Sequence, residues 1–251
     1  MFACPYCFTP LTGVELRCDK CNYQGWIKDG RYHLHRTDNT WEECQAQVRA
    51  THKAAMSTQP LPVPTPEEIE CLKHVGDVNQ ILITKSKELL GDIQGKIFLD
   101  LGGHTGWSAN AFVERGAMGF ILDIDELGMP KSTKLLVSIV GDGYYLPFID
   151  GYFDFVFDTA SLHHFVDKEK VLTQMKRVLK PGGMYVSQGN PPNPHPTDDA
   201  RQVYWDKYGL IEIFATKEEY EADFKKVFNN FEFHYPVANG NSIMVARKEA
   251  V

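Results

Sequence analysis

The stretch LDLGGHTGWSA, from Leu99 to Ala109, places an aspartate, three glycines and a histidine between an apolar run and an amphipathic segment. The apolar run is typical of a buried strand, and the following segment is typical of a helix. In an open parallel sheet such a junction lies at the carboxyl edge, where a crevice forms. Gly102 and Gly106 can let the backbone approach a ligand closely, and Gly103 adds freedom where a side chain would obstruct. The turn is therefore predicted to bind a ligand.

Short apolar runs alternate with helical patterns from residue 96 onward. The runs at 96–101, 119–124, 134–140, 153–158 and 183–188 are predicted to be strands that are buried on both faces. Residues 106–116 and 167–180 are predicted to be amphipathic helices between them. This alternation indicates an α/β fold with a parallel, doubly wound sheet.

The order of residues in the turn favours a cationic ligand. A dinucleotide-binding turn has the pattern G-x-G-x-x-G, which cradles a pyrophosphate. This chain has Asp100-x-Gly102-x-x-x-Gly106, with an acidic residue at the end of the strand. That carboxylate would repel a pyrophosphate, whereas a cationic cofactor with an amino-acid tail would be accepted.

The aspartate–glycine pattern resembles the first motif of class I S-adenosylmethionine (SAM)-dependent methyltransferases of the methyltransferase type 11-like group. The other signatures follow in order over residues 91–251: Asp123 at the end of the second strand, GDGYYLPFIDGYFDFVF at 141–157, VLKPGGMYVSQ at 178–188 and FEFHYPVANGNSIMVARK at 231–248. The resemblance implies a Rossmann-like, mostly parallel sheet of seven strands that closes with an antiparallel hairpin. His104 departs from the pattern, because the family commonly has another glycine there.

The same resemblance implies roles for individual residues in SAM binding. Asp100, Gly102 and Gly106 would line the methionine end of the cofactor. Asp123 would hold the ribose, and Asp142 would face the adenine amino group with Gly143 beside it. An alternative is that Asp123 caps a helix and Asp125 holds the ribose. The full set of predicted cofactor-binding residues is Asp100, Gly102, Gly103, Gly106, Asp123, Asp142, Gly143 and Asp158.

The segment DTASLHHF, residues 158–165, follows the fourth strand and lies near the expected methyl-transfer site. Methyl transfer from a sulfonium is an in-line displacement, in which positioning supplies much of the acceleration. A base is needed only if the acceptor must lose a proton. His163 and His164 are the candidate catalytic bases, and the alternative is that they only contact the terminus of the next helix. Tyr144 and Tyr145 are alternative residues of the acceptor pocket.

Four of the six cysteines lie close together at the N-terminus, in two Cys-x-x-Cys pairs: Cys4, Cys7, Cys18 and Cys21. This spacing suits tetrahedral Zn²⁺, and four protein ligands would make the zinc structural. A redox dithiol and two disulfides are the alternatives. The segment 4–34 resembles the small zinc ribbons that precede some methyltransferase domains or act alone as their partners. Cys44 and Cys71 are predicted to be buried or idle thiols.

The organisation along the chain follows from these motifs. Residues 1–36 are predicted to form the zinc ribbon, and residues 91–251 the SAM-dependent methyltransferase domain. Residues 37–90 form a helical linker with a proline-rich connector at 57–68. This linker is either a packing element or a lid over the pocket.

The composition limits the partners. The formal net charge is −7, without a basic run or a long apolar stretch, so we expect a cytoplasmic protein that does not span a membrane, and binding to nucleic acid is disfavoured. Nothing in the sequence indicates the oligomeric state.

The predicted function is SAM-dependent methylation of a small molecule, with oxygen as the methylated atom. The aromatic segment 190–214 would stack on a planar acceptor, and it contains His195 as another possible base. A ribosomal RNA base methyltransferase with a zinc ribbon is the first alternative. A non-catalytic SAM-binding scaffold is the second.

Overall fold

The computed structural model describes residues 1–49 without 40, 44 and 47, then 66–190, 192, 215–238 and 240–250. Within the helix that begins at Pro66, side chains are described from residue 76 onward. Several features of the sequence lie outside the described residues: Cys44, the part of the proline-rich connector at 57–65, the side chain of Cys71, and segment 193–214 with His195.

Five parallel strands form the centre of the molecule, in the spatial order β5-β4-β3-β6-β7. They are β3 (Ile97–Leu101), β4 (Met118–Asp123), β5 (Leu136–Val140), β6 (Phe153–Thr159) and β7 (Leu179–Gln188). Their apolar side chains are buried on both faces of the sheet, which explains the continuous apolar runs. The predicted parallel, doubly wound sheet is confirmed.

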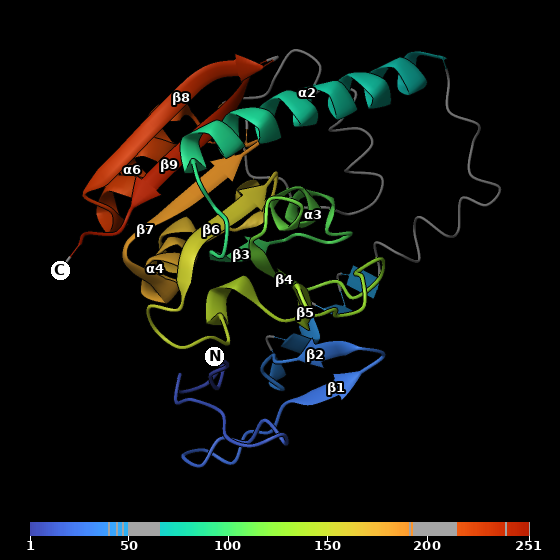
Figure 1. Cartoon of the computed structure of the whole chain (residues 1–251), viewed down its shortest axis with the longest axis vertical. Helices are drawn as coiled ribbons and strands as arrows, with labels where there is room; N and C mark the ends of the chain where they lie inside the picture. Colours follow the sequence, from blue (N-terminus) through green and yellow to red (C-terminus); the bar gives the residue numbers. More distant parts are fainter. Residues whose placement is uncertain are drawn as a thin grey trace.

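An antiparallel hairpin completes the predicted seven strands. It consists of β8 (Asn230–Ala238) and β9 (Asn241–Arg247), and β9 lies between β7 and β8. Met184 pairs with Arg247 at one end of the β7–β9 ladder, and Gln188 pairs with Ile243 at the other. Figure 1 shows the hairpin at the edge of the sheet farthest from the N-terminal segment.

Two further strands extend the sheet to nine strands among the described residues, and the sequence did not predict them as part of it. The N-terminal segment forms β1 (Trp26–Lys28) and β2 (Arg31–His33), and β2 runs parallel to β5 through the pairs Tyr32–Ile139 and His33–Val140. Phe2 is also buried in the main core, with its ring centroid 5.0 Å from that of Tyr32. The N-terminal segment is therefore continuous with the sheet (Figure 1).

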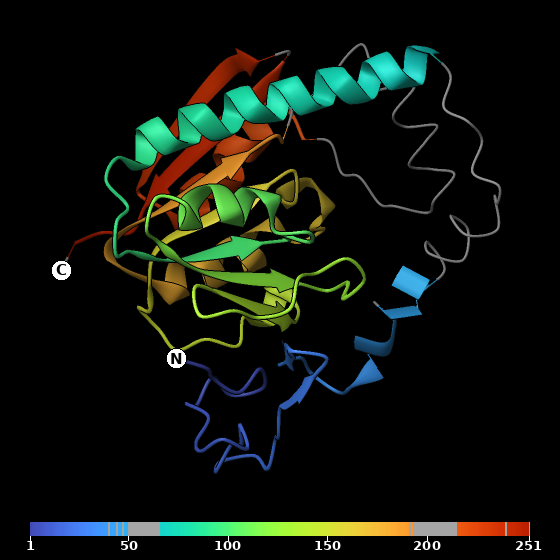
Figure 2. The ribbon, with the colours of Figure 1, turned by 45° about the vertical axis from the view of Figure 1, so that its right-hand side comes forward.

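Helices cover both faces of the sheet, as Figure 2 shows. One face packs against α2 (Pro66–Leu90) and α3 (Trp107–Val113), through side chains such as Leu82 and Phe112. The other packs against α4 (Lys168–Val178) and α6 (Lys217–Val227), through side chains such as Leu172 and Phe224.

The described half of α2 is a packing element. Val78, Leu82 and Ile83 are buried in the core, and Ser86 Oγ donates a buried hydrogen bond of 2.8 Å to Gln188 Oε1 at the end of β7. No helix in the described part of the chain is long and apolar enough to cross a bilayer.

Candidate functional site

The glycine-rich loop after β3 has the backbone conformation that the sequence requires. Gly102 has φ 68° and Gly106 has φ 74°, a region that favours glycine. A Cβ at Gly102 would collide with Ser161 Oγ, and a Cβ at Gly106 would lie 2.7 Å from Ile121 Cδ1. Gly103 is equally confined, since its Cβ would lie 2.7 Å from the carboxyl group of Asp100. The three glycines therefore allow a tight turn between β3 and α3.

Asp100 lies beneath this turn and is fully buried. Ser108 Oγ donates a hydrogen bond of 2.6 Å to its Oδ2, whereas Oδ1 has no hydrogen-bond partner among the described residues. Burial raises the pKa of Asp100 to about 7, and the charges of Asp158 and Asp123 act in the same direction. A buried carboxylate with one unused oxygen is suited to a cationic ligand that donates hydrogen bonds.

Asp123 is the last residue of β4 and stands beside the glycine-rich loop. Its Oδ2 accepts a hydrogen bond of 3.0 Å from the backbone N–H of His104, and its Oδ1 accepts one of 2.9 Å from Asp125 N–H. Burial raises its pKa above the ordinary range. Each oxygen still has a lone pair for a ligand hydroxyl. No helix begins at Asp123, so the alternative of a helix cap is wrong.

Asp142 follows β5 and caps a short helical turn, η1 (Gly143–Tyr145). Its Oδ1 accepts a hydrogen bond of 2.8 Å from Tyr144 N–H, and burial raises its pKa. A Cβ at Gly143 would lie 2.7 Å from the Phe165 ring, so this glycine also permits close packing. Three carboxylates, from Asp100, Asp123 and Asp142, thus occur at or just beyond the carboxyl ends of three neighbouring strands.

Asp158 also lies at this edge of the sheet, on β6, but its oxygens already have several partners. Oδ1 accepts hydrogen bonds from the N–H groups of Ser161 and Leu162 at 3.2 Å and from Asn190 Nδ2 at 3.1 Å. Oδ2 accepts one of 2.6 Å from the Tyr185 hydroxyl. The side chain is fully buried, and this burial raises its pKa. The contacts tie Asp158 to its neighbours in the protein.

His163 lies on η2 (Leu162–His164) and is connected to Asp158 through Asn190. Asn190 Oδ1 is 2.9 Å from His163 Nδ1 and also accepts a hydrogen bond of 3.1 Å from the His163 backbone N–H. The amide nitrogen of Asn190 donates to Asp158. This orientation of the amide requires a proton on Nδ1 of His163, so Nε2 is the basic nitrogen of the neutral ring. His164 is exposed, and its ring centroid is 4.1 Å from that of His163.

The sequence did not indicate that Arg36 reaches this side of the domain. Its guanidinium lies between two rings, 4.8 Å from the centroid of Tyr6 and 4.4 Å from that of Tyr145. Arg36 also pairs with Asp38. Tyr145 accepts a hydrogen bond of 2.8 Å from Lys170 Nζ. The end of the ribbon segment is therefore anchored beside the turn that carries Asp142.

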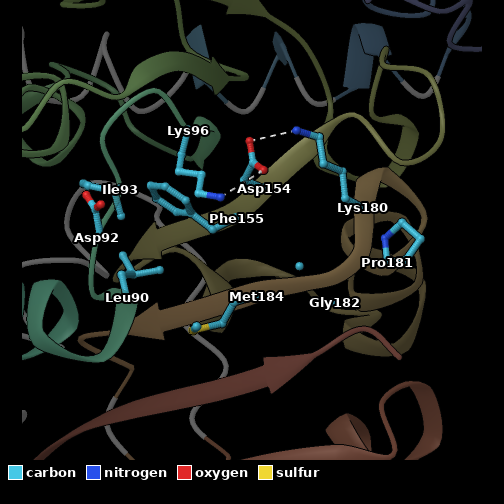
Figure 3. Close-up of a pocket in the computed structure, with 11 residues that line it drawn as sticks. Leu90, Asp92, Ile93, Lys96, Asp154, Phe155, Lys180, Pro181, Gly182 and Met184 are labelled. Atoms are coloured by element: carbon cyan, nitrogen blue, oxygen red, sulfur yellow. Dashed lines mark hydrogen bonds and ion pairs between the residues drawn. The ribbon is translucent and has the colours of Figure 1, made fainter. Parts of the chain in front are cut away.

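A hollow of about 210 Å³ lies at the opposite, amino edge of the sheet (Figure 3). Asp154 is its main charged group, and its Oδ2 accepts hydrogen bonds of 2.9 Å from Ile97 N–H and from Lys180 Nζ. Lys96 lies 3.9 Å from its Oδ1. The Asp154 carboxylate is therefore already paired with protein groups, whereas Asp100 at the carboxyl edge has an oxygen without a partner among the described residues.

The four N-terminal cysteines come together as their spacing predicts. The sulfur atoms of Cys4, Cys7, Cys18 and Cys21 all lie within 4.8 Å of one another. Four of the sulfur pairs are separated by 3.3 to 3.8 Å. An S–S bond is about 2.05 Å long, so these pairs are not disulfides. The cluster could hold one metal ion.

Comparison with known proteins agrees with this arrangement. A family model described as a methyltransferase domain matches residues 99–187. The ubiquinone/menaquinone biosynthesis C-methyltransferase UbiE of Bordetella avium is 38% identical over 99 residues, which are 36% of this chain and 39% of that protein. The chain spans about two fifths of the length of the curated relatives it matches.

Two solved structures are similar in fold. A chain in the complex between the Haloferax volcanii Trm112 methyltransferase activator and a candidate methyltransferase has a TM-score of 0.55 at 18% identity, covering 71% of this chain and 93% of that one. Phosphoethanolamine N-methyltransferase 2 of Haemonchus contortus, solved with phosphomonomethylethanolamine and S-adenosylhomocysteine, has a TM-score of 0.56 at 17% identity, covering 68% and 53%. Residues 99–187 therefore match a methyltransferase-domain family model, and the chain shares the fold of these two solved structures.

Proposed function

We propose that the protein is a SAM-dependent methyltransferase that acts on a small molecule. The observation that carries this proposal is the set of three carboxylates, Asp100, Asp123 and Asp142, around a glycine-rich loop at one edge of the sheet. SAM has a sulfonium, an ammonium, a ribose diol and an adenine amino group, all of which suit acidic or hydrogen-bond-accepting partners. The net charge of −7 disfavours RNA as the acceptor.

The relatives favour carbon over oxygen as the methylated atom. The Bordetella avium relative is a ubiquinone/menaquinone biosynthesis C-methyltransferase, and no relative described above is named for O-methylation. We therefore propose an acceptor with an ionisable hydroxyl on an aromatic ring. Loss of the hydroxyl proton places electron density on the ring carbons as well as on oxygen. The same base would thus serve either atom.

We propose that His163 is this base and that Asp158 and Asn190 support it. Asn190 holds the proton on Nδ1, so Nε2 is the nitrogen that would take the acceptor proton. Asp158 fixes the Asn190 amide from the other side. We therefore propose that Asp158 supports His163 rather than the cofactor.

We propose that the four N-terminal cysteines bind one structural zinc ion. With Zn–S bonds of about 2.3 Å, a tetrahedral site has sulfur–sulfur separations of about 3.8 Å. Four of the observed sulfur–sulfur separations, 3.3 to 3.8 Å, are near this value. Four thiolates leave no open position, so zinc would stabilise the ribbon and take no part in catalysis.

Freshly purified, reduced protein is expected to contain one zinc ion per chain, as measured by atomic emission. Cys18→Ser should lower the melting temperature by roughly 5 to 10 °C, because a loosened ribbon would also disturb the β2–β5 ladder. Cys44→Ser, at a cysteine that belongs to neither Cys-x-x-Cys pair, is the matched control and should leave zinc content unchanged. Less than half an equivalent of zinc in the wild type would argue against the site.

Calorimetric titration with S-adenosylhomocysteine tests the cofactor assignment. Asp123→Ala should weaken binding by about 1 to 3 kcal/mol, because charge-assisted hydrogen bonds to the ribose are lost. Asp125→Ala is the comparison variant, since Asp125 is the alternative ribose partner. If only Asp125→Ala weakens binding, the ribose assignment moves to Asp125. If the wild type fails to bind the product, the proposed function is wrong.

A further inference from the structure

His104 stands where the family commonly has a glycine, and its backbone has the conformation that glycine favours. Its φ is 35°, in the left-handed region, which is unfavourable for a residue with a β-carbon. Strain of this kind persists where surrounding contacts over-determine the conformation, and such sites are often functional. The contacts of the His104 side chain therefore need an explanation.

The imidazole of His104 reaches across to the loop between β4 and β5. Its Nε2 lies 2.5 Å from the carbonyl oxygen of Leu127, so this nitrogen carries a proton and donates it. The ring also covers Gly128, where an added Cβ would lie 3.0 Å from ring atoms Cε1 and Nε2. A single side chain thus joins the glycine-rich loop to the β4–β5 loop.

These contacts enclose the predicted ribose partner. The backbone N–H of His104 donates to Asp123 Oδ2, and Asp125 N–H donates to Asp123 Oδ1. Leu127 N–H in turn donates a hydrogen bond of 2.9 Å to Asp125 Oδ1. The chain of hydrogen bonds runs from His104 through Asp123 and Asp125 to Leu127, and the imidazole closes it into a ring.

The far part of the same loop is held by the N-terminal segment. Ser132 N–H donates a hydrogen bond of 2.8 Å to the Gly30 carbonyl, and Arg31 Nε donates one of 3.1 Å to the Met129 carbonyl. The part next to Asp123, residues 124–128, lies between this anchor and His104. The N-terminal segment also contacts this part directly, because Gln45 Nε2 donates a hydrogen bond of 2.8 Å to the Ile124 carbonyl and Lys28 Nζ lies 3.9 Å from Glu126 Oε1. The His104 side chain anchors these residues from the side of the glycine-rich loop.

We propose that His104 is a positioning residue for cofactor binding: its side chain fixes residues 124–128 against the glycine-rich loop, so that Asp123 and Asp125 are in place before the cofactor arrives. The inference rests on the proposed function, since it takes SAM and its product as the ligands. Pre-organisation of a loop improves affinity because less conformational entropy is lost on binding.

The test compares His104→Gly with His104→Gln by titration with S-adenosylhomocysteine. Glycine is the residue common in the family and relieves the backbone strain at position 104, so the melting temperature should be unchanged or slightly higher. It also removes the contact between the imidazole and the Leu127 carbonyl, so we expect binding of S-adenosylhomocysteine to be about tenfold weaker. Glutamine keeps a donor that can reach the Leu127 carbonyl, and it should bind within about threefold of the wild type. His234→Ala, on β8, is the matched control for loss of a histidine.

Hydrogen exchange of the cofactor-free protein gives a second readout. The amides of Asp125 and Leu127 should exchange faster in His104→Gly than in the wild type, whereas amides in β4 should not change. Equal affinity and equal exchange in the two proteins would overturn the inference while leaving the proposed function intact. A wild type that fails to bind the product would overturn both.

Discussion

Asparagine in place of Asp100 is expected to make the cofactor-free protein more stable at pH 8 and to weaken its affinity for SAM. Burial raises the pKa of Asp100 to about 7, so at pH 8 an ionised carboxylate lies within the core. The shift spans about three pH units of about 1.4 kcal/mol each, so the charge costs at most roughly 4 kcal/mol. We expect the free energy of unfolding of the variant to exceed that of the wild type by about 2 to 4 kcal/mol at pH 8.

The dependence of this difference on pH has a defined sign. The folded-state pKa of Asp100 lies above its unfolded value, so between about pH 4 and pH 7 the folded state holds a proton that the unfolded state lacks. The destabilisation of the folded protein by the Asp100 charge therefore becomes smaller as the pH falls below 7. Asparagine does not titrate, so the advantage of the variant should be largest above pH 7 and lost near pH 4. Urea unfolding at several pH values measures the difference.

The loss of SAM affinity has a separate cause. Asp100 Oδ1 has no partner in the described part of the chain, and a cationic ligand would gain a charge-assisted hydrogen bond there. Removing such a bond should weaken binding by roughly 1.5 to 3 kcal/mol, or about tenfold to over a hundredfold. Calorimetry with SAM at pH 8 measures this loss.

Asp154→Asn is the matched control, at the opposite edge of the sheet. Burial alone would raise the pKa of Asp154, but Ile97 N–H and Lys180 hold it below the ordinary value. Its substitution should therefore reduce stability at pH 8 and leave SAM affinity unchanged. An Asp100→Asn protein that is less stable than the wild type at pH 8, or that binds SAM normally, would contradict the role given to Asp100.

The central strands could be predicted because their side chains are buried on both faces. The apolar runs at 96–101 and 153–158, for example, correspond to β3 and β6. The glycine-rich turn could also be predicted, because it needs glycine at positions with positive φ, and Gly102 and Gly106 have this conformation in the structure. Helix α6 was missed although it has a sequence signal: Thr216 and Glu219 form a capping box at its start.

The attachment of the ribbon to the sheet could not be predicted. Strand β2 has three residues, too few for a detectable period, and its partner β5 lies about a hundred residues farther along the chain. Pairing at such separation depends on tertiary packing, such as the burial of Phe2 against Phe148. The position of Arg36 between Tyr6 and Tyr145 depends on the same packing.

The hydrogen-bonded connection from His163 through Asn190 to Asp158 could not be predicted from the sequence either. Asn190 belongs to the GNPPNP stretch after β7, whereas Asp158 lies near the end of β6 and His163 follows that strand. Only the pairing of β6 with β7 brings these residues together. A residue near the end of a strand can face either the ligand or the core, and Asp158 proved to face its own protein partners.

His163→Ala is expected to lower turnover of an aromatic acceptor with an ionisable hydroxyl by about 10² to 10⁴-fold, while SAM affinity stays within twofold. The lost interaction would belong to proton transfer, so kcat should fall without a matching change in cofactor binding. The wild-type rate should decline in acid, where an imidazole is protonated, and this decline should be absent from the residual activity of the variant. Transfer of a labelled methyl group measures turnover and its pH dependence, and calorimetry measures SAM affinity.

Asn190→Ala separates positioning from a purely structural role. Without the Asn190 acceptor, the neutral His163 ring should shift toward the Nε2–H form, which nitrogen-edited NMR of the ring detects. We expect turnover about tenfold lower than the wild type and a stability loss of about 1 to 2 kcal/mol from the broken network. His164→Ala is the control at the neighbouring histidine and should retain most activity.

The outcomes distinguish the possible mechanisms because each removes a different group. Loss of activity in His164→Ala alone would move the base to the exposed ring and would leave the Asn190 network as a structural support. Full activity in both histidine variants would eliminate an imidazole base at these positions, leaving proximity alone or a base such as His195, which lies outside the described residues. The proposed mechanism requires two results together: loss of activity in His163→Ala and an altered tautomer in Asn190→Ala. His163→Ala removes Nε2, and Asn190→Ala changes its protonation. Nε2 of His163 is therefore the atom that accepts the proton if both results are found.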